Sequence, residues 1–422
     1  EARSAQDVRH LKTSLFASLQ NAAQVADVET VLLQGKPERG PGGYHMNELT
    51  TCPRMPTPFT SLKCLFLYNV DILEQGFKAA LQALTNIQQL NISWFGSHRL
   101  NAYTSETRPL QKVVNFDFLA IILSHLPTLK DLELSQICAT VWSGFSSRVT
   151  LNICDDAMLP DLERLALKSV GQISTGTIGE ISSKFPGLKH LELTINECSR
   201  INEGTIRELA IPPFRELISF RGNNQFGMDT ATSAHIISLL TLMPKLKALE
   251  FDVHQTDQLK HESMLRLMDT TPKLAVLKLA GYRQILQETV HSIVHTFKQL
   301  EVLYLQASMI RLDRPEEVSK VMARKLTKLE SFLSNVELPN IDELPSLKYK
   351  WFSESEMIRQ RVCIPDSPDC LWLEVKVGSD LWKKALGYQY FHPREAFCID
   401  SHLRPGLDIK VDYDASRENP YW

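Results

Sequence analysis

A short pattern of apolar positions recurs along the chain: an apolar residue, two variable residues, a second apolar residue, one variable residue and a third apolar residue. Clear copies begin at Leu62, Leu129, Leu162, Leu188, Leu246, Leu274 and Leu300, and weaker copies begin at Val28, Ile87, Leu217, Leu329 and Leu347. From Leu162 to Leu329, consecutive copies start 26 to 29 residues apart. A period this regular predicts a stack of equivalent structural units.

The segments between the copies carry apolar residues three and four positions apart, as amphipathic helices do. In one segment these residues are Ile236, Leu239, Leu240 and Met243. The segments are 71–84, 116–126, 175–185, 230–243, 262–268, 287–297 and 316–326, and several run into a proline that ends a helix: Pro127, Pro186, Pro244 and Pro272. Each unit is therefore predicted to be a short strand, a loop, a helix and a turn.

In its period and its apolar triplet the chain resembles the leucine-rich-repeat family. The resemblance implies an α/β fold, a leucine-rich-repeat solenoid or horseshoe with a parallel sheet on the concave side and helices on the convex side. One unit cannot bury its own apolar face, whereas stacked units share a continuous core. The alternative is an unrelated leucine-rich α/β fold that shows this spacing by chance.

The repeats are expected to occupy residues 28–347 and to be irregular. The longer steps near the N-terminus indicate loop insertions at about 34–58, which is rich in Pro and Gly, and at about 96–115. Residues 1–27 contain one amphipathic stretch and are expected to form an N-terminal helical cap or the remnant of a removed module.

Residues 348–422 break the period and are rich in aromatic side chains. Open solenoids need end caps, so we expect this region to be a C-terminal cap, with a partner-binding module as the alternative. Within it, residues 371–377 alternate like a strand, and residues 380–386 have the pattern of a helical turn.

The variable positions flanking the third apolar residue of each copy are expected to point to the concave side, because strand side chains alternate. The central column then reads Phe66, Asn91, Glu133, Ala166, Glu192, Arg221, Glu250, Lys278 and Tyr304. The next column reads Tyr68, Ser93, Ser135, Lys168, Thr194, Asn223, Asp252, Ala280 and Gln306.

From these columns we expect a concave partner-binding face made of Phe66, Tyr68, Asn91, Glu133, Lys168, Glu192, Arg221, Glu250, Asp252, Lys278 and Tyr304. The face is mixed in charge, and aromatic residues lie at its ends. A nucleic-acid groove would carry a basic stripe, so the pattern favours a protein partner and no nucleic acid. The alternative for each charged residue is that it only solvates an exposed sheet face.

The overall composition adds little attraction to any charged partner. The chain has 46 Lys and Arg against 49 Asp and Glu, a net charge of −3, which does not favour nucleic acid or anionic lipid. No apolar run reaches the roughly 20 residues that span a bilayer, and the first residues lack the pattern of a secretory signal. We expect a cytoplasmic or nuclear protein with no membrane association.

Candidate chemistry is sparse. The eight cysteines form no CxxC pair and are expected to be reduced, although Cys363 and Cys370 would bridge in an oxidising compartment. His291 and His295 have the i, i+4 spacing of a metal pair but lack a third ligand nearby, so packing or surface roles are favoured. No phosphate-binding, dinucleotide-binding, hydrolase or zinc-protease motif is present. We expect no catalytic residue, no cofactor and no metal, and therefore no enzyme.

The irregular repeats resemble those of F-box/leucine-rich-repeat proteins more than those of ribonuclease inhibitor. The latter carry Asn or Cys three positions after the last apolar residue, a place where only Asn196 fits here. The resemblance implies a protein–protein interaction scaffold, in its narrower form a substrate-recognition subunit of a cullin-type ubiquitin ligase. No F-box is visible, so a Skp-type adaptor is expected only if an N-terminal module is missing.

Two other functions remain open at this point. One is a regulator of an enzyme, such as a GTPase activator or an inhibitor of the leucine-rich-repeat type, which regular Asn-bearing repeats and an acidic face would favour. The other is a catalytic activity in residues 348–422, where no acid–base or nucleophile set is visible.

Overall fold

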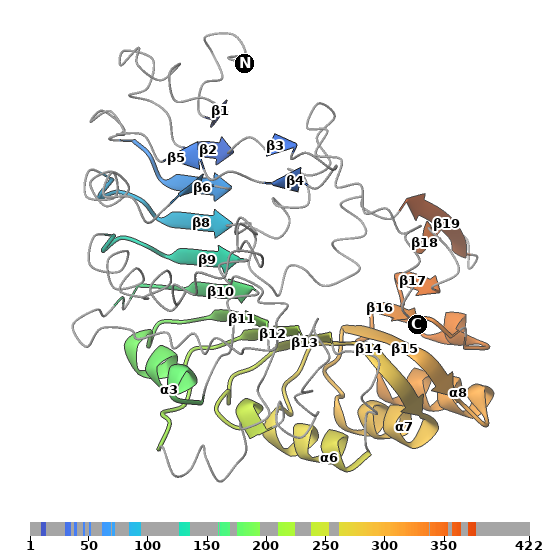
Figure 1. Cartoon of the computed structure of the whole chain (residues 1–422). Coiled ribbons are helices and arrows are strands. Elements are labelled where there is room, and N and C mark those ends of the chain that lie inside the picture. The colour runs from blue at the N-terminus through green and yellow to red at the C-terminus, as the bar shows by residue number, and fades with distance from the viewer. Residues whose placement is uncertain are drawn as a thin grey trace, which may run out of the picture.

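The computed structural model of this chain (Figure 1) describes residues 10–13, 30–34, 38–39, 45–46, 50–51, 61–68, 70–71, 84–93, 126–135, 159, 161–168, 175–194, 210–223, 238–252, 261–336, 338–352, 357–363 and 370–376. Most of the length of the predicted helices at 71–84, 116–126 and 230–243 lies outside these residues. So do the insertion at 96–115 and the helical turn expected at 380–386.

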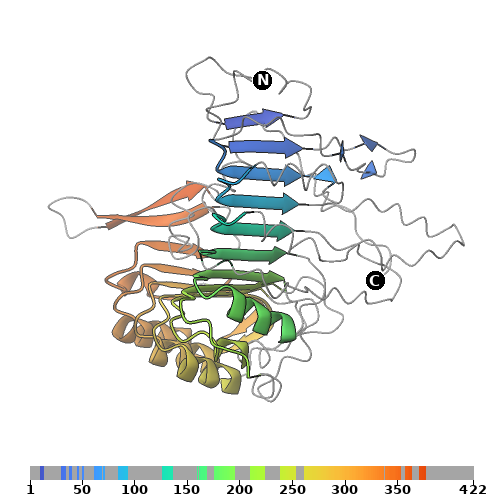
Figure 2. The ribbon, with the colours of Figure 1, turned by 90° about the vertical axis from the view of Figure 1, so that its left-hand side faces the viewer.

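One open sheet of 15 strands runs through the described residues in the order β1-β2-β6-β8-β9-β10-β11-β12-β13-β14-β15-β16-β17-β18-β19. The strands up to β17 pair in parallel, and β18 and β19 pair antiparallel at the end of the sheet. Figure 2 shows the first strands stacked as successive parallel rungs.

One strand lies in each copy of the apolar pattern. These strands are β2 (Thr30–Gln34), β6 (Cys64–Tyr68), β8 (Gln89–Ser93), β9 (Asp131–Ser135), β10 (Arg164–Lys168), β11 (His190–Thr194), β12 (Ser219–Asn223), β13 (Ala248–Asp252), β14 (Val276–Leu286), β15 (Val302–Arg311), β16 (Ser331–Ser334) and β17 (Tyr349–Phe352). Every predicted copy of the pattern therefore contains a strand, including the weak copies at Val28 and Leu347. One strand per unit in an open parallel sheet fits a leucine-rich-repeat-like protein.

A repeated backbone contact joins each unit to the next. The carbonyl of Lys63 accepts the N–H groups of Gln88 and Gln89 at 2.8 and 3.0 Å, and the carbonyl of Gln88 accepts those of Lys130 and Asp131 at 2.8 and 3.0 Å. The same double contact continues from unit to unit as far as the carbonyl of Glu330, which accepts two N–H groups of the β17 unit. This contact satisfies the backbone just before each strand and fixes where the next rung begins.

The pairing register places equivalent apolar residues side by side in two buried columns. The first contains Leu65, Leu90, Leu132, Leu165, Leu191, Phe220, Leu249, Leu277, Leu303 and Phe332. The second contains Leu67, Ile92, Leu134, Leu167, Leu193, Gly222, Phe251, Leu279, Leu305 and Ser334. Each fully buried Leu contributes about 1.5–3 kcal/mol, so the stack has one continuous core.

Two units break the leucine pattern in the same way. Gly222 and Ser334 occupy the second column with almost no apolar volume, and in both units the residue two positions earlier is phenylalanine: Phe220 and Phe332. Phe220 is fully buried and meets Phe251 of the next unit edge to face, with ring centroids 6.0 Å apart. The larger ring supplies the volume that the small residue omits, which keeps the core close-packed.

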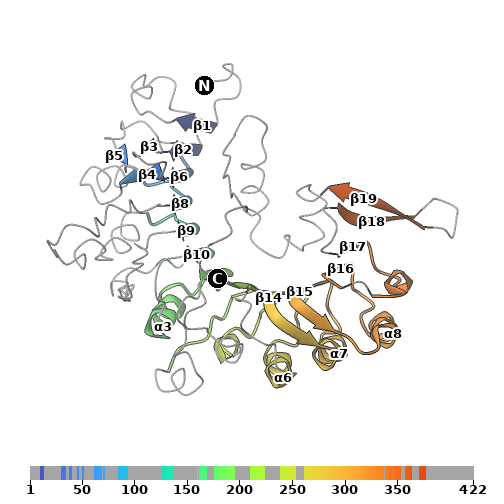
Figure 3. The same cartoon turned by 45° about the vertical axis from the view of Figure 1, so that its right-hand side comes forward.

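The described helices lie on one side of the sheet. They are α3 (Thr175–Lys184), α6 (His261–Thr270), α7 (Gln287–Thr296) and α8 (Pro315–Lys325), with the short 3-10 helix η4 (Ile341–Glu343) in the last unit. Neighbouring helices α6, α7 and α8 contact one another in sequence, and α7 contacts β14. Figure 3 shows the sheet bending and these helices along its outer side. The predictions at 175–185, 262–268, 287–297 and 316–326 are confirmed within one or two residues.

The N-terminal region differs from the expected helical cap where it is described. His10–Thr13 form β1, which pairs in parallel with β2. In these residues the prediction of a helix is wrong, because a strand there satisfies the backbone groups along the free edge of β2. Local amphipathic spacing carries no information about that edge.

The insertion near 34–58 contains short paired strands. β3 (Glu38–Arg39) pairs antiparallel with β4 (His45–Met46), and β5 (Thr50–Thr51) pairs in parallel with β7 (Val70–Asp71). At the other end of the chain the periodic sheet extends to Phe352, beyond the position where the period was expected to break. Leu371–Val377 was expected to be a strand, and β19 spans Cys370–Lys376.

The strands β14 and β15 are about twice as long as the other strands of the parallel repeats. Their pairing shifts register between Leu279 and Tyr282, where Gly281 has a φ of 75°, a backbone conformation that glycine adopts without strain. Beyond this bulge the side chain of Asn335 accepts from the N–H of Ala307 at 3.2 Å and donates to its carbonyl at 2.5 Å. Asn335 thus continues the pairing of β15 where β16 has ended.

No helix among the described residues is long and apolar enough to cross a membrane.

Candidate functional site

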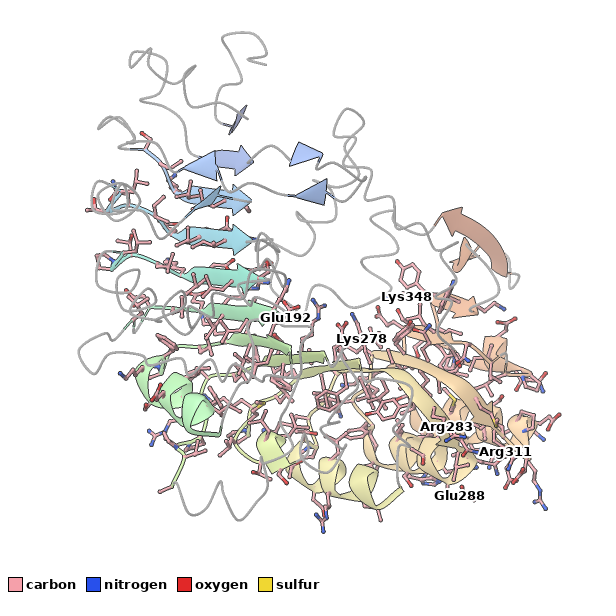
Figure 4. The ribbon with its side chains drawn as sticks, in the orientation of Figure 1. Glu192, Lys278, Arg283, Glu288, Arg311 and Lys348 are labelled. Atoms are coloured by element: carbon pink, nitrogen blue, oxygen red, sulfur yellow. The ribbon has the colours of Figure 1, made fainter. Side chains whose placement is uncertain are left out.

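The side of the sheet opposite the two buried columns carries the predicted central column. The register pairs Phe66 with Asn91, and the column continues through Glu133, Ala166, Glu192, Arg221, Glu250, Lys278, Tyr304, Leu333 and Trp351. We call this side the charged face. In Figure 4, Glu192 and Lys278 lie on this side of the sheet, whereas Glu288 belongs to α7 on the other side.

Arg164 is the centre of the charge network on this face. Its Nη1 donates to Asp131 Oδ1 at 3.0 Å, and its Nη2 donates to Glu133 Oε2 at 3.0 Å and to Glu192 Oε2 at 3.4 Å. Lys168 Nζ lies 3.1 Å from Glu133 Oε1 and 3.3 Å from Glu192 Oε2. Only 4% of the Arg164 side chain is exposed, so one guanidinium joins three strands in a site largely closed to water.

The network continues along the column with alternating signs. Arg221 Nη1 lies 3.6 Å from Glu192 Oε1, and its Nη2 donates to Glu250 Oε2 at 2.8 Å. Lys278 Nζ donates to the same Glu250 oxygen at 3.2 Å, and its side chain is only 3% exposed. Four carboxylates are thus matched by four cations, so the network is neutral. We call this set the ladder: Asp131, Glu133, Glu192 and Glu250 with Arg164, Lys168, Arg221 and Lys278.

The pKa of Glu133 shows the effect of this pairing. Burial by itself would raise it, but Lys168 and Arg164 outweigh burial and lower the pKa from 4.5 to about 2. Burial likewise would lower the pKa of Lys168, but Glu192 and Glu133 raise it above its ordinary value of 10.5. Both groups therefore stay charged through the physiological range.

Stability is expected to fall in acid because of these carboxylates. Burial opposes the charge of Glu250, but Lys278 and Arg221 lower its pKa to about 2, as happens for Glu133. Because both folded-state values lie below the ordinary value of 4.5, their contribution is complete above about pH 4.5 and is lost as the pH falls towards 2. Urea unfolding at pH 5 and pH 3 measures this loss.

The control for the acid effect is the double variant Glu133→Gln and Glu250→Gln. It removes both titrating groups, so its free energy of unfolding should change less between pH 5 and pH 3 than that of the unsubstituted chain. An equal change in both proteins would show that other carboxyls account for the acid sensitivity.

The ladder ends in an aromatic platform formed by Tyr304 and Trp351. Their rings stack with centroids 6.1 Å apart and an interplanar angle of 27°. They come from β15 and β17, two strands apart, and the fully buried Leu333 of β16 lies between them in register. Strands two apart are separated by about 10 Å, so the rings lean together over Leu333. Both residues are half-buried.

The structure places the predicted residues unevenly. Glu133, Glu192, Arg221, Glu250, Lys278 and Lys168 are joined in one network, and Tyr304 belongs to the platform. Phe66 on β6 is half-buried and lies two strands from the network, whereas Asn91 on β8 is 2% exposed and pairs in register with Glu133 of the network. The backbones of Tyr68 and Asp252 belong to β6 and β13, but their side chains lie outside the described residues.

Three residues of the face were missed from the sequence: Asp131, Arg164 and Trp351. Asp131 and Arg164 lie two positions before the central column, on the same side of their strands, and Gln89 Nε2 of β8 extends this row by donating to Asp131 at 3.1 Å. The alternation that defined the other columns also applies to this position and would have found them. Trp351 was missed because it lies within the weakest copy of the pattern, which begins at Leu347.

His291 and His295 stack on α7 with ring centroids 6.3 Å apart. Within the described part of the chain, no three His, Cys, Asp or Glu side chains gather as a metal site requires.

Comparison with solved structures gives weak similarity. No family profile matches the chain, and no curated protein matches it. Among solved structures, a chain in the "Crystal structure of Rad7 and Elc1 complex in yeast" is 14% identical, with a TM-score of 0.37, over 72% of this chain and 71% of that chain. A TM-score this low assigns neither fold nor function.

Proposed function

We propose that this chain is a non-catalytic protein-interaction scaffold whose charged face forms the concave side of a horseshoe, with helices on the convex side, and binds another protein there. The observation that carries the proposal is the half-buried Tyr304–Trp351 platform, which keeps part of its ring surface accessible beside a neutral, internally paired ladder. Aromatic side chains fixed on a rigid sheet are the residues that most often anchor protein interfaces.

The two parts of the face contribute differently to binding. A partner that approached Arg164 or Lys278 would meet cations already bonded to carboxylates and largely removed from water, so new ion pairs there would gain little. The platform offers apolar ring surface without breaking an existing ion pair. We therefore place the energetic centre of the interface at Tyr304 and Trp351, with the ladder as a rigid support.

In the narrower form of this proposal, the partner is a substrate of a cullin-type ubiquitin ligase, and a Skp-type adaptor joins through a module outside this chain. The resemblance of the repeats to F-box/leucine-rich-repeat proteins supports this form. Recovery of a Skp-type adaptor and a cullin with the chain in affinity capture would favour it, and recovery of a small GTPase would favour the regulator of an enzyme instead.

Substitution of the platform tests the site. Partners are captured with the purified chain, identified by mass spectrometry and then measured as purified proteins. Trp351→Ala and Tyr304→Ala are each expected to weaken binding by about tenfold or more, because truncation of an aromatic anchor at an interface centre costs upwards of about 1.4 kcal/mol.

Leu265→Ala is the matched control for the platform variants. Leu265 is an apolar residue on α6 with 41% of its surface exposed, so its loss removes apolar surface from the helix side of the sheet. Binding should be unchanged in this variant. Equal weakening by Leu265→Ala and Trp351→Ala, or none by either platform variant in a folded protein, would move the interface away from the charged face.

A further inference from the structure

The last two strands of the sheet place Cys363 and Cys370 opposite each other. β18 (Met357–Cys363) and β19 (Cys370–Lys376) pair antiparallel in a register that runs from Met357 opposite Lys376 to Cys363 opposite Cys370. The two cysteines are the final pair of this ladder. Only residues 364–369 connect them, and these include Pro365 and Pro368.

Directly opposed residues in an antiparallel pair have Cα atoms about 4.5 or 5.5 Å apart, depending on whether the pair is hydrogen-bonded. Disulfides span Cα separations of about 4.4–6.8 Å, so the Cα separation of either kind of pair falls within the range of a disulfide. We propose that Cys363 and Cys370 are a modification site at which a disulfide closes the β18–β19 hairpin. This inference does not depend on the proposed function of the charged face.

The oxidant that the proposal names is a small-molecule disulfide such as glutathione disulfide. The thiolate of one cysteine attacks a sulfur of glutathione disulfide, which forms a mixed disulfide and releases one glutathione thiolate. The thiolate of the opposed cysteine then attacks the protein sulfur of that mixed disulfide and releases the second glutathione. Two protein thiols are oxidised to one disulfide, and one glutathione disulfide is reduced to two glutathiones. The two protons lost by the cysteine thiols are taken up by the two released glutathione thiolates.

The position of the pair gives the disulfide a structural consequence. β19 is the terminal strand of the sheet and pairs only with β18 among the described strands. A terminal strand is the part of a sheet most easily lost by fraying. A bond between Cys363 and Cys370 ties the start of β19 to the end of β18, so the oxidised chain should resist proteolysis within 357–376 longer than the reduced chain.

One tryptic peptide reports the reaction. Cleavage after Arg361 and Lys376 gives residues 362–376, which contain both cysteines and no other tryptic site. The folded full chain is equilibrated with excess glutathione disulfide, the remaining thiols are alkylated without reductant, and the digest is analysed by mass spectrometry. We expect this peptide to be unalkylated and lighter by two hydrogen atoms than its dithiol form, and to accept two alkyl groups after reduction.

Folding dependence is tested by repeating the equilibration in urea. If the register holds the cysteines together, half-oxidation in the folded chain should need about tenfold less glutathione disulfide than in the unfolded chain. Equal midpoints would show that the short connection alone accounts for the bond. The proposal would be overturned if the peptide from the chain oxidised in its folded state had both thiols alkylated, or if it carried two glutathiones.

The variants Cys363→Ser and Cys64→Ser give the matched controls. Cys363→Ser removes the resolving thiol, so Cys370 should retain one glutathione as a stable mixed disulfide. Cys64 is half-buried on β6, in another part of the sheet, and forms no disulfide, so its replacement should leave the oxidation of the peptide unchanged. Loss of the disulfide in the Cys64→Ser chain would contradict the assigned pairing.

Discussion

Replacement of Arg164 by alanine is expected to lower the free energy of unfolding by about 3–5 kcal/mol, the range measured when one partner of a buried ion pair is removed. The variant leaves Asp131, Glu133 and Glu192 close together without the guanidinium that neutralises them. Their mutual repulsion acts between β9 and β11, on either side of β10, so adjacent units lose contact stability together. Chemical denaturation followed by tryptophan fluorescence measures the loss.

A surface ion pair supplies the control for Arg164. Lys245 Nζ lies 2.8 Å from Glu216 Oε1, but both side chains are more than half exposed. Lys245→Ala should therefore change stability by less than about 1 kcal/mol. Arg164→Lys keeps the charge but not the two-pronged geometry, and should recover only part of the loss. An Arg164→Ala chain as stable as the Lys245→Ala chain would show that the network contributes no net stability.

The second large effect is expected in the core at Phe220. Phe220→Ala should cost about 3–5 kcal/mol, because the ring is fully buried and packs edge to face against Phe251. Phe220→Leu should also destabilise, by about 1 kcal/mol, although leucine is the usual residue at this position of the repeat. The reason is that Gly222, at the second core position of the unit, supplies no side chain to fill the space.

The sign of the Phe220→Leu effect is the informative result. Substitutions towards the common residue of a repeat often stabilise, so a gain in stability would contradict the packing described for Phe220 and Gly222. Phe332→Leu should behave in the same way, since Ser334 takes the place of Gly222 in that unit. Leu265→Ala, at an exposed position, should change stability by no more than about 0.5 kcal/mol.

Much of the fold follows from local sequence pattern. The apolar triplets predict every rung from β2 to β17, because a strand side chain is buried or exposed by its parity and the period sets the distance to the next strand. Alternation also predicts the central column of the charged face. The four helices that the structure describes in full follow from apolar spacing and from the prolines that end some of the helical segments.

Other features depend on residues that are far apart in sequence. Arg164 reaches Asp131 and Glu192, which are 33 and 28 positions away, so the pairing of charges is visible only when the strands are in register. From the sequence these charges were expected to meet a partner or solvent, whereas in the structure they neutralise one another. Strand β1 and the antiparallel pairing of β18 likewise depend on a free sheet edge, which no local pattern encodes.

The central claim is that a partner protein docks on the charged face around Tyr304 and Trp351. The most direct test places a photoreactive amino acid at Gln306, an exposed position two residues beyond Tyr304, and in a second protein at Lys320, an exposed position on α8. With the purified partner, we predict a covalent adduct from position 306 that Trp351→Ala abolishes, and none from position 320. Equal adducts from both positions, or an adduct from position 320 alone, would contradict the account.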